Sequence, residues 1–372
     1  MKVLVTGGAG FVGSHTVDSL IEKGHTVRIL DNLDPQVHGS SGNKPVYLNK
    51  EAEFINGDIR NESDVKNALD GIQVVFHLAA LVGVGQSMYD IKRYVEVNSL
   101  GGAILLDQLA NGKHSVEKVV VASSMSIYGE GAYSCRNCGK VYPRLRTPEQ
   151  LKERSWDVCC PICGLDVEAI PVSEDKPLYP TSIYAVTKRD HEEMFLSVGN
   201  AYKIPTVALR YFNIYGTRQS ISNPYTGVAA IFLSRILNNN RPLIFEDGLQ
   251  SRDFIHVSDL VKANIIAMEK SEADYNVFNV GTGRNLSVLD IANILIKRLN
   301  VDLEPEIVNK FREGDIRHCF ADASKIETEL GFRADVTFES GLDDLIEWAK
   351  VTDSDDQVEK ATQELAAKGL TW

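Results

Sequence analysis

The chain has 372 residues, of which 44% are hydrophobic, and its formal net charge is −12. This length fits one large domain or two modest domains that share an interface, and the apolar content suffices for a sizeable core. The negative charge argues against partners such as nucleic acid or an anionic membrane, although a small anionic ligand needs only a local cluster of arginines and N–H groups. The sequence contains no run of about 18 apolar residues, which is the length that would predict a membrane span.

The N-terminal sequence leads directly into the apolar run Lys2–Thr6, which glycine follows. A secretory signal has a basic start, a longer apolar stretch and a small-residue cleavage site, so we expect a cytoplasmic protein. The chain contains six cysteines, and all except one fall between Cys135 and Cys163. In a reducing compartment such a cluster favours a metal site over disulfides.

The first half of the chain alternates short β-branched runs with amphipathic stretches. Strands are predicted at Lys2–Thr6, Thr26–Leu30, Glu53–Ile55, Val74–Leu78, Lys118–Ala122 and Val207–Arg210. Helices are predicted at Phe11–Lys23, Asp64–Leu69, Tyr89–Ala110 and Ile183–Gly199. This alternation, with continuously apolar strands, predicts an α/β fold: a Rossmann-type, doubly wound parallel sheet with helices on both faces.

Beyond about Asn213 the pattern changes to loops, helices and scattered strands. Helices are predicted at Gly227–Leu237 and Val288–Arg298, a strand at Val277–Val280, and a helix at Leu260–Glu269 that could return to the first domain. We therefore expect a first domain over 1–212, interrupted by an insert over 131–170. A smaller C-terminal lobe over 213–350 follows, and then a charged tail over 351–372 that we expect to be helical or partly disordered.

Glycines at Gly7, Gly10 and Gly13 have G-x-x-G-x-x-G spacing between the first predicted strand and helix. Such glycines allow a tight turn and a close approach to a pyrophosphate, which the helix N-terminus also attracts. Asp31 ends the second predicted strand, where a carboxylate accepts hydrogen bonds from the adenosine ribose and repels a 2′-phosphate. The pattern predicts binding of NAD rather than NADP.

Two later strand ends add to this site. Asp58 and Ile59 follow the third predicted strand and are expected near the adenine, while the small residues in Leu78-Ala79-Ala80 let the backbone approach the cofactor. His77 is interpreted as a packed residue rather than a catalyst.

Tyr184 and Lys188 form a Y-x-x-x-K pair, which lies on one face of a helix. A tyrosine phenol is too weak an acid to act as a base near neutrality, but a neighbouring ammonium and a nicotinium ring stabilise its phenolate. Ser124, at the end of the fifth predicted strand, is placed to hydrogen-bond a reacting hydroxyl.

Together with Tyr128-Gly129, Leu209–Asn213, Arg252–Val257, Asn279–Gly283 and Arg312–Asp315, these motifs resemble the extended short-chain dehydrogenase/reductase family, in its NAD-dependent nucleotide-sugar epimerase/dehydratase group. The resemblance covers the chain to about Lys350, apart from the insert. It implies that NAD contacts Gly7, Gly10, Phe11, Val12, Gly13, Asp31, Asn32, Asp58, Ile59, Leu78, Ala79, Ala80, Asn98, Ser123, Tyr184, Lys188, Tyr211 and Phe212. It implies a nucleotide-sugar substrate held by Ser124, Asn213, Leu243, Phe245, Arg252, Asn279 and Arg312, in a C-terminal lobe that binds substrate. It also implies a homodimer formed by Tyr89–Ala110 and Ile183–Gly199.

Sugar 4,6-dehydratases of this family carry an Asp-Glu pair directly after the catalytic hydroxyl, where this chain has Met125 and Ser126. Within the family, 4-epimerases, decarboxylases and reductases therefore remain as candidate activities. The segments Leu33–His38, Gly83–Met88 and Ser222–Gly227 are similar to chains described as dTDP-L-rhamnose 4-epimerases. The first interpretation is NAD-dependent epimerisation at C4 of a nucleotide-diphosphate sugar, of dTDP-L-rhamnose or UDP-sugar type, through a transient 4-keto sugar.

Two alternatives stay open. One is an NAD(P)-dependent nucleotide-sugar reductase or dehydrogenase, which would turn over added cofactor. The other is a non-catalytic protein that senses NAD, against which the intact set of Ser124, Tyr184 and Lys188 argues, because a sensor needs no proton relay.

The insert contains Cys135-x-x-Cys138 and Cys160-x-x-Cys163, each pair followed by glycine. The C-x₂-C-x₂₁-C-x₂-C pattern is typical of a zinc ribbon, in which each pair directs two thiolates at one tetrahedral Zn²⁺. Four sulfurs leave no open coordination position, so the predicted zinc is structural; such a site also accepts iron. Cys159 and Cys319 are expected to lie outside it.

Overall fold

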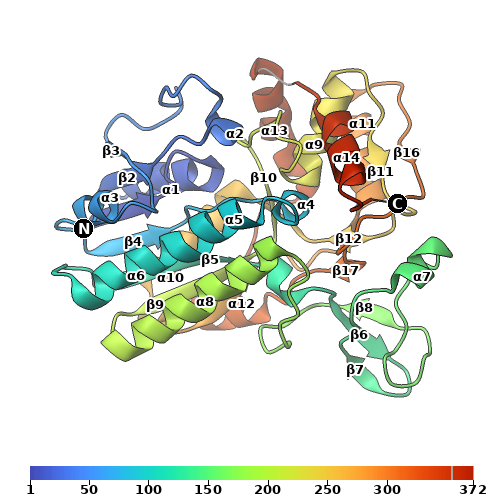
Figure 1. Ribbon diagram of the computed structural model, residues 1–372, viewed down its shortest axis with the longest axis horizontal. Coiled ribbons are helices and arrows are strands. Elements are labelled where there is room, and N and C mark those ends of the chain that lie inside the picture. The colour runs from blue at the N-terminus through green and yellow to red at the C-terminus, as the bar shows by residue number, and fades with distance from the viewer. Residues whose placement is uncertain (353–354, 372) are drawn as a thin grey trace.

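The computed structural model describes residues 1–352 and 355–371 (Figure 1). Its centre is a seven-stranded sheet in the order β14-β9-β5-β4-β1-β2-β3, in which every neighbouring pair is parallel. The strands are β1 (Lys2–Thr6), β2 (Thr26–Asp31), β3 (Glu53–Asn56), β4 (Val74–His77), β5 (Lys118–Ser124), β9 (Thr206–Tyr211) and β14 (Val277–Val280). The predicted Rossmann-type sheet is thereby confirmed, and the predicted strand Val277–Val280 joins it.

Both faces of this sheet are buried, because successive side chains of a strand point to opposite sides. In β5, Val120 and Ala122 join one apolar cluster, and Val119 and Val121 join the other. The helices α1 (Phe11–Glu22), α10 (Val257–Glu269) and α12 (Ser324–Leu330) cover the first face. The helices α3 (Glu62–Ala68), α6 (Gly101–Asn111) and α8 (Ile183–Tyr202) cover the second.

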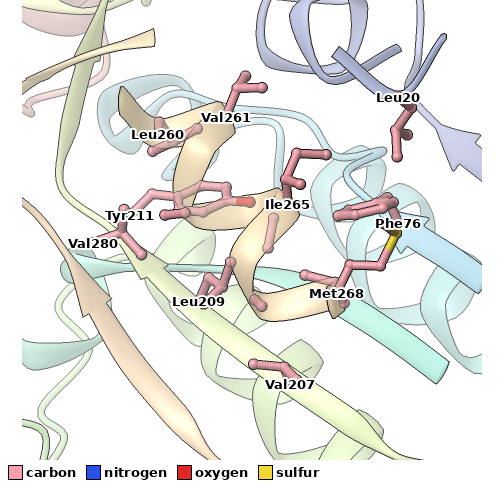
Figure 2. Packing of buried hydrophobic residues seen from close by; sticks show 14 of the residues in the cluster. Leu20, Phe76, Val207, Leu209, Tyr211, Leu260, Val261, Ile265, Met268 and Val280 are labelled. Carbon is pink, nitrogen blue, oxygen red and sulfur yellow. The ribbon is translucent and has the colours of Figure 1, made fainter. Parts of the chain in front are cut away.

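Helix α10 belongs to the first face although it follows the lobe's first strands in the sequence. Figure 2 shows Leu260, Val261, Ile265 and Met268 of this helix above the side chains of β9. Full burial of one such side chain contributes roughly 1.5–3 kcal/mol. The segment Leu260–Glu269, which we expected could return to the first domain, thus packs against the central sheet.

The prediction of a single helix over Tyr89–Ala110 is wrong in one respect, because a π-helix interrupts the α-helical segment. The segment consists of α5 (Ile91–Tyr94), the π-helix η1 (Val95–Leu100) and α6. Gly101 begins α6, and a Cβ atom there would lie 2.6 Å from the side chain of Ile59, so the backbone passes close to its neighbour. The wider π turn buries the side chain of Asn98.

The smaller lobe has its own apolar core between α9 (Val228–Leu237), α11 (Val288–Leu299) and α13 (Phe338–Val351). Short strand pairs surround it: β10 (Asn213–Tyr215) with β13 (Phe254–His256), and β11 (Leu243–Ile244) with β16 (Glu306–Ile307). In a three-stranded sheet, β12 (Ser251–Arg252) lies between β15 (Leu286–Ser287) and β17 (His318–Cys319). Of the predicted tail, Val358–Ala367 forms helix α14.

The insert is a separate small body at the side of the molecule (Figure 1). It contains an antiparallel sheet in the order β7-β6-β8 and the short helix α7 (Pro148–Lys152). The strands are β6 (Ala132–Cys135), β7 (Gly139–Val141) and β8 (Glu168–Ile170). The remaining short elements are α2 (Pro35–His38), α4 (Val84–Ser87), η2 (Met125–Tyr128) and η3 (Ser271–Ala273).

Within residues 1–352 and 355–371, none of the helices combines the length and the apolar character that a membrane crossing requires.

Candidate active site

A cavity of about 640 Å³ extends from the carboxyl ends of the central strands to the smaller lobe. This is the usual ligand position in an open parallel α/β sheet. Its lining includes most of the predicted site residues: Gly7, Gly10, Phe11, Val12, Gly13, Asp31, Asn32, Ile59, Leu78, Ala79, Ala80, Ser123, Ser124, Tyr184, Lys188, Tyr211, Phe212, Asn213, Leu243, Phe245, Arg252 and Arg312. The predicted residues outside the lining are Asp58, Asn98 and Asn279.

The glycine loop forms one end of this cavity because side chains are excluded from it. Gly7 has a φ of 70°, and a Cβ atom there would lie 2.9 Å from the backbone of Ala79. A Cβ atom on Gly13 would lie 2.1 Å from the carbonyl oxygen of Gly7. Gly10 precedes α1, whose N-terminus has no side-chain cap. The loop therefore leaves N–H groups and a positive helix end for a pyrophosphate, so the residues fit a dinucleotide.

Asp31 stands at the end of β2 and lines the same part of the cavity. Its Oδ2 atom accepts a hydrogen bond from the Ala9 N–H at 3.0 Å, and its Oδ1 atom accepts one from the Leu33 N–H at 2.9 Å. These bonds fix the carboxylate beside the glycine loop. Each oxygen keeps a further lone pair with which to accept a ribose hydroxyl.

Asp58 lies behind this surface. Its carboxylate accepts hydrogen bonds from Arg60 at 2.7 and 2.9 Å and from the Asn32 amide at 3.0 Å, and Arg60 lowers its pKa to about 2. Its side chain therefore holds Asn32, which does line the cavity.

Asn98 and His77 are both buried. The Asn98 amide donates to the Leu81 carbonyl and to Thr187 Oγ1 at 3.1 and 3.0 Å, and its Oδ1 atom accepts from the Leu81 N–H at 2.8 Å. Asn98 thus fixes the loop after β4 instead of facing the cavity. His77 stacks on Phe195 with ring centroids 4.9 Å apart, and burial lowers its pKa to about 3, in agreement with a packed residue.

Ser124, Tyr184 and Lys188 meet where β5 ends and α8 begins. The helix starts at Ile183, one residue before Tyr184, because Ser182 caps it by accepting a hydrogen bond from the Ala185 N–H. Ser87 Oγ accepts another from the Tyr184 N–H at 3.0 Å. One helical turn later, Lys188 donates from Nζ to the Ala122 carbonyl at 3.0 Å. The three side chains thus lie on one wall, Ser124 from β5 and both Tyr184 and Lys188 from α8.

Burial changes the acidity of two of these groups. It raises the pKa of Tyr184, an effect that a hydrogen bond with Ser124 opposes. It lowers the pKa of Lys188 to about 8. The free protein thus favours the neutral phenol, so that formation of a phenolate requires additional positive charge beside it.

Behind this wall lies a buried ionic network. Ser123 donates to Glu192 at 2.7 Å, and Arg210 pairs with the same carboxylate through Nε at 2.9 Å. Arg210 also donates to the Tyr128 hydroxyl at 2.8 Å, and that hydroxyl donates to Asn279 Oδ1 at 2.6 Å. The network fixes the end of β5.

Asn279 is a correction to the sequence-based expectation that it lines the nucleotide pocket. It is fully buried, and its amide donates to the carbonyls of Val172 and Asp322 at 2.8 and 3.2 Å. Its Oδ1 atom accepts from Tyr128, so both polar atoms of this buried side chain bind other residues of the protein. Its position on β14, one strand beyond β9, keeps it out of the cavity.

Two arginines occupy the far end of the cavity. Arg252 donates to the carbonyls of Ser251, Arg317 and Ile316 at 2.7 to 3.0 Å. Arg312 donates from Nε to Asp315 Oδ2 at 2.8 Å and stacks over the Phe245 ring, 4.7 Å from its centroid. Guanidinium groups with fixed planes suit diphosphate oxygens.

Three amide oxygens on the lining have no hydrogen-bond partner among the described residues: those of Asn213, Gln219 and Gln250. A buried acceptor without a partner is costly, so these atoms indicate where a ligand or water donates. Asn213 was expected from the sequence. Gln250 was not expected, although it stands only two residues before the motif Arg252–Val257, on which the resemblance partly rests.

The tail also contributes to the lining, through Val358, Ala361, Thr362, Leu365 and Leu370, which the sequence analysis missed. Helix α14 is held beside the cavity by two contacts: Leu365 approaches Gly85 of α4, and Glu364 accepts a hydrogen bond from Tyr225 at 3.0 Å. The available signal was the spacing of Val358, Ala361 and Leu365, which places them on one helical face.

In the insert, the sulfurs of Cys135, Cys138, Cys160 and Cys163 lie within 4.8 Å of one another. Gly139 and Gly164 follow the two pairs with φ of 72° and 74°, which allows the tight turn after each pair. Four cysteine sulfurs at this spacing fit a tetrahedral metal ion. Cys159 and Cys319 are outside the cluster.

Comparison with known proteins gives consistent results. Residues 3–147 match the family model of the NAD dependent epimerase/dehydratase family, and residues 166–345 match that of GDP-mannose 4,6 dehydratase. The dTDP-L-rhamnose 4-epimerase of Burkholderia thailandensis is 33% identical over 93% of this chain and 94% of that protein. A putative UDP-glucose 4-epimerase of Methanocaldococcus jannaschii is 34% identical over 94% of this chain and 98% of that protein.

Solved structures agree in fold. The UDP-glucose 4-epimerase of Thermotoga maritima with UDP-glucose has a TM-score of 0.76 at 31% identity, covering 94% of this chain and 99% of that chain. The UDP-glucuronic acid 4-epimerase of Bacillus cereus, in complex with UDP-glucuronic acid and NAD, has a TM-score of 0.77 at 28% identity with the same coverage.

Proposed function

The chain belongs to the NAD-dependent epimerase/dehydratase family, and from this premise we propose that it is a 4-epimerase of a nucleotide-diphosphate sugar. The substrate is of dTDP-L-rhamnose or UDP-sugar type. One observation carries the proposal: the glycine loop, the set of Ser124, Tyr184 and Lys188, and the arginines Arg252 and Arg312 line a single cavity. We expect the dinucleotide at the glycine-loop end of this cavity and the sugar diphosphate at the arginine end.

In this mechanism Tyr184, as the phenolate, takes the proton from the sugar 4-hydroxyl, and Ser124 hydrogen-bonds that oxygen. When bound, NAD supplies the hydride acceptor for C4 and a positive nicotinamide ring beside the phenol. Lys188 adds a second positive charge, which offsets the effect of burial on the pKa of Tyr184. The 4-keto sugar then turns in the cavity, so that C4 takes the hydride back on its opposite face while Tyr184 returns the proton to the oxygen.

A dehydratase reaction is disfavoured by the residues that follow Ser124. Water elimination needs a proton donor and a base beside the sugar, and Met125 instead lies in an apolar cluster. Ser126 donates its hydroxyl to Ser124 Oγ at 3.0 Å. Neither side chain supplies a carboxyl group.

The proposed cofactor is NAD, with the carboxylate of Asp31 accepting the ribose hydroxyls. The proposed metal is one structural Zn²⁺ per chain, held by Cys135, Cys138, Cys160 and Cys163. The compact cysteine cluster supports this site, and because a ribbon of about forty residues has too small a core to fold reliably, a metal would supply the missing stability.

We further propose a homodimer formed by the α5–η1–α6 segment and α8. Ile91, Val95 and Leu100 on the first element and Val186 and Tyr202 on the second are exposed large hydrophobic residues. A two-fold contact between these helices and their copies would cover them.

The experiment that tests the proposed function is incubation of the purified protein with a panel of UDP- and dTDP-sugars. NMR would identify the C4 epimer, and absorbance would follow NADH. An epimerase forms the epimer without net change in NAD or NADH. Net cofactor turnover would instead identify a reductase or dehydrogenase, and binding of NAD without any sugar turnover would identify a sensor.

A further inference from the structure

The insert is joined to the substrate lobe by a buried pair of charges. Arg146 of the insert and Glu246 of the lobe have side chains that are only 1% and 3% exposed. They form a two-point contact, with guanidinium N–H groups at 2.8 and 2.9 Å from the two carboxylate oxygens. Arg146 also donates to the carbonyl of Asp315 at 3.1 Å. One side chain of the insert thus forms hydrogen bonds with two segments of the lobe.

Both segments carry residues that line the cavity. Glu246 follows Phe245 directly, and Asp315 holds Arg312, whose guanidinium stacks on the Phe245 ring. Phe245, Arg312 and Asp315 are all lining residues. Arg146 therefore supports the stacked pair of Phe245 and Arg312 from the side away from the ligand.

Arg317 forms a second link of the same kind. Its guanidinium donates to Asp157 of the insert at 2.9 Å and to Asp247 of the lobe at 2.6 Å. Its carbonyl accepts a hydrogen bond from Arg252 at 3.0 Å. The wall that carries both candidate phosphate-binding arginines is thus fixed to the insert.

Two features indicate that the contact between Arg146 and Glu246 positions the lobe segments more than it stabilises the fold. Apolar packing already attaches the insert, because Leu151 and Trp156 form a buried cluster with Phe311 of the lobe. Buried ion pairs add little net stability compared with apolar residues of similar volume. In addition, Glu246 has a φ of 54°, a conformation that persists only where the surroundings fix it.

We propose that Arg146 is a positioning residue for the nucleotide diphosphate, through which the insert controls ground-state binding of the substrate and not the chemical step. The inference rests on the proposed function, because it takes Phe245, Arg252 and Arg312 as contacts of the nucleotide diphosphate. Arg146 touches no reacting atom; it acts through Glu246 and Asp315.

The test is Arg146→Met in the full chain. Calorimetric titration with UDP, dTDP and NAD would measure binding, and the sugar that the panel identifies would give kcat and KM. We expect the dissociation constant of the nucleotide diphosphate and the KM to rise about tenfold or more, with kcat within about twofold and NAD affinity unchanged. The matched control is Arg154→Met, an exposed arginine of the same insert, which should change none of these values.

If the single variant does not fold, the double variant Arg146→Met/Glu246→Met removes both charges of this pair and should show the same loss of affinity. Arg317, which also donates to Glu246 at 3.2 Å, keeps Asp157 and Asp247 as partners in that variant. Unchanged nucleotide affinity in either folded variant, or a fall in kcat at constant KM, overturns the inference while the proposed function stands. A wild-type protein that binds neither UDP nor dTDP overturns both.

Discussion

Lys188 donates from its buried Nζ atom to the carbonyl oxygen of Ala122 at 3.0 Å, in an environment that lowers its pKa to about 8 from 10.5. Because the folded-state pKa lies below the unfolded value, the folded protein binds fewer protons between about pH 8 and 10.5. This group alone therefore makes the free energy of unfolding rise with pH across that window. Below about pH 8 the buried charge lowers the free energy of unfolding by about 3 kcal/mol.

Replacement of this lysine should consequently stabilise the protein while removing activity. We expect Lys188→Met to raise the free energy of unfolding of the cofactor-free protein by about 1–2 kcal/mol at pH 7, after allowance for the lost hydrogen bond, and by less at pH 10. Urea denaturation at the two pH values measures this. Lys92→Met, at an exposed position, is the control. Lower stability at pH 7 would contradict the interpretation.

Tyr184→Phe removes the hydroxyl that exchanges the proton with the sugar. We expect turnover to fall roughly 10²–10⁴-fold, while the dissociation constant of NAD changes little, because the ring keeps its packing. Product formation by NMR and NAD titration measure the two quantities. Tyr275→Phe, at an exposed position outside the cavity, should behave as wild type. Near-normal turnover in Tyr184→Phe would refute the assignment of the base.

Asp31→Ala removes the carboxylate that is proposed to accept the ribose hydroxyls and to repel a 2′-phosphate. Hydrogen bonds to a charged group contribute about 1.5–3 kcal/mol, so NAD affinity should fall by roughly ten- to a hundredfold and the preference over NADP should narrow. Titrations with both cofactors measure this, with Asp70→Ala, at an exposed position, as the control. The assignment fails if the wild type already binds NADP as well as NAD.

Cys160→Ser removes one proposed metal ligand. Protein purified without chelator should contain about one zinc per chain, and the variant should lose most of it. Cys159→Ser changes the neighbouring cysteine, which lies outside the cluster, and should retain the metal. Elemental analysis measures the zinc content of the three proteins. A wild type without metal, or a Cys160→Ser variant with the full zinc content, would contradict the proposed four-cysteine site.

Leu100→Glu places a charge on the helical surface proposed for the dimer, and burial of that charge would be costly. We expect wild type to sediment as a dimer at micromolar concentration and the variant to shift toward monomer. Val46→Glu, on a loop where the valine is 98% exposed, should not alter the sedimentation. A monomeric wild type would rule out the proposed interface.

The sequence predicted the central sheet well because its signals are local: apolar strands, glycines at a strand-helix turn, and a carboxylate at a strand end. It predicted less where a role depends on distant contacts. Asn279 belongs to a recognisable motif, but only the tertiary structure shows that Tyr128, Val172 and Asp322 occupy its amide. The π-helix around Asn98 and the close packing of Gly101 against Ile59 directly after it are likewise tertiary features, which no helical periodicity reveals.

The tail and the insert illustrate the same limit. For helix α14 the sequence predicted a charged tail that is helical or partly disordered, and only the structure shows that its few apolar residues line the cavity. For the insert, the cysteine spacing sufficed to predict which four residues cluster. The contact of Arg146 with Glu246, far apart in the chain, had no counterpart in the sequence pattern.

The position of β14 has a practical consequence for any attempt to divide the chain. This strand and helix α10 come from the second half of the sequence, yet they complete the sheet beside β9 and cover one of its faces. A fragment ending near residue 212 would leave the edge of β9 that faces β14 unpaired and Leu209 without its cover. Unpaired, apolar strands of this kind recruit further chains, so the isolated fragment should aggregate instead of yielding a working cofactor-binding half.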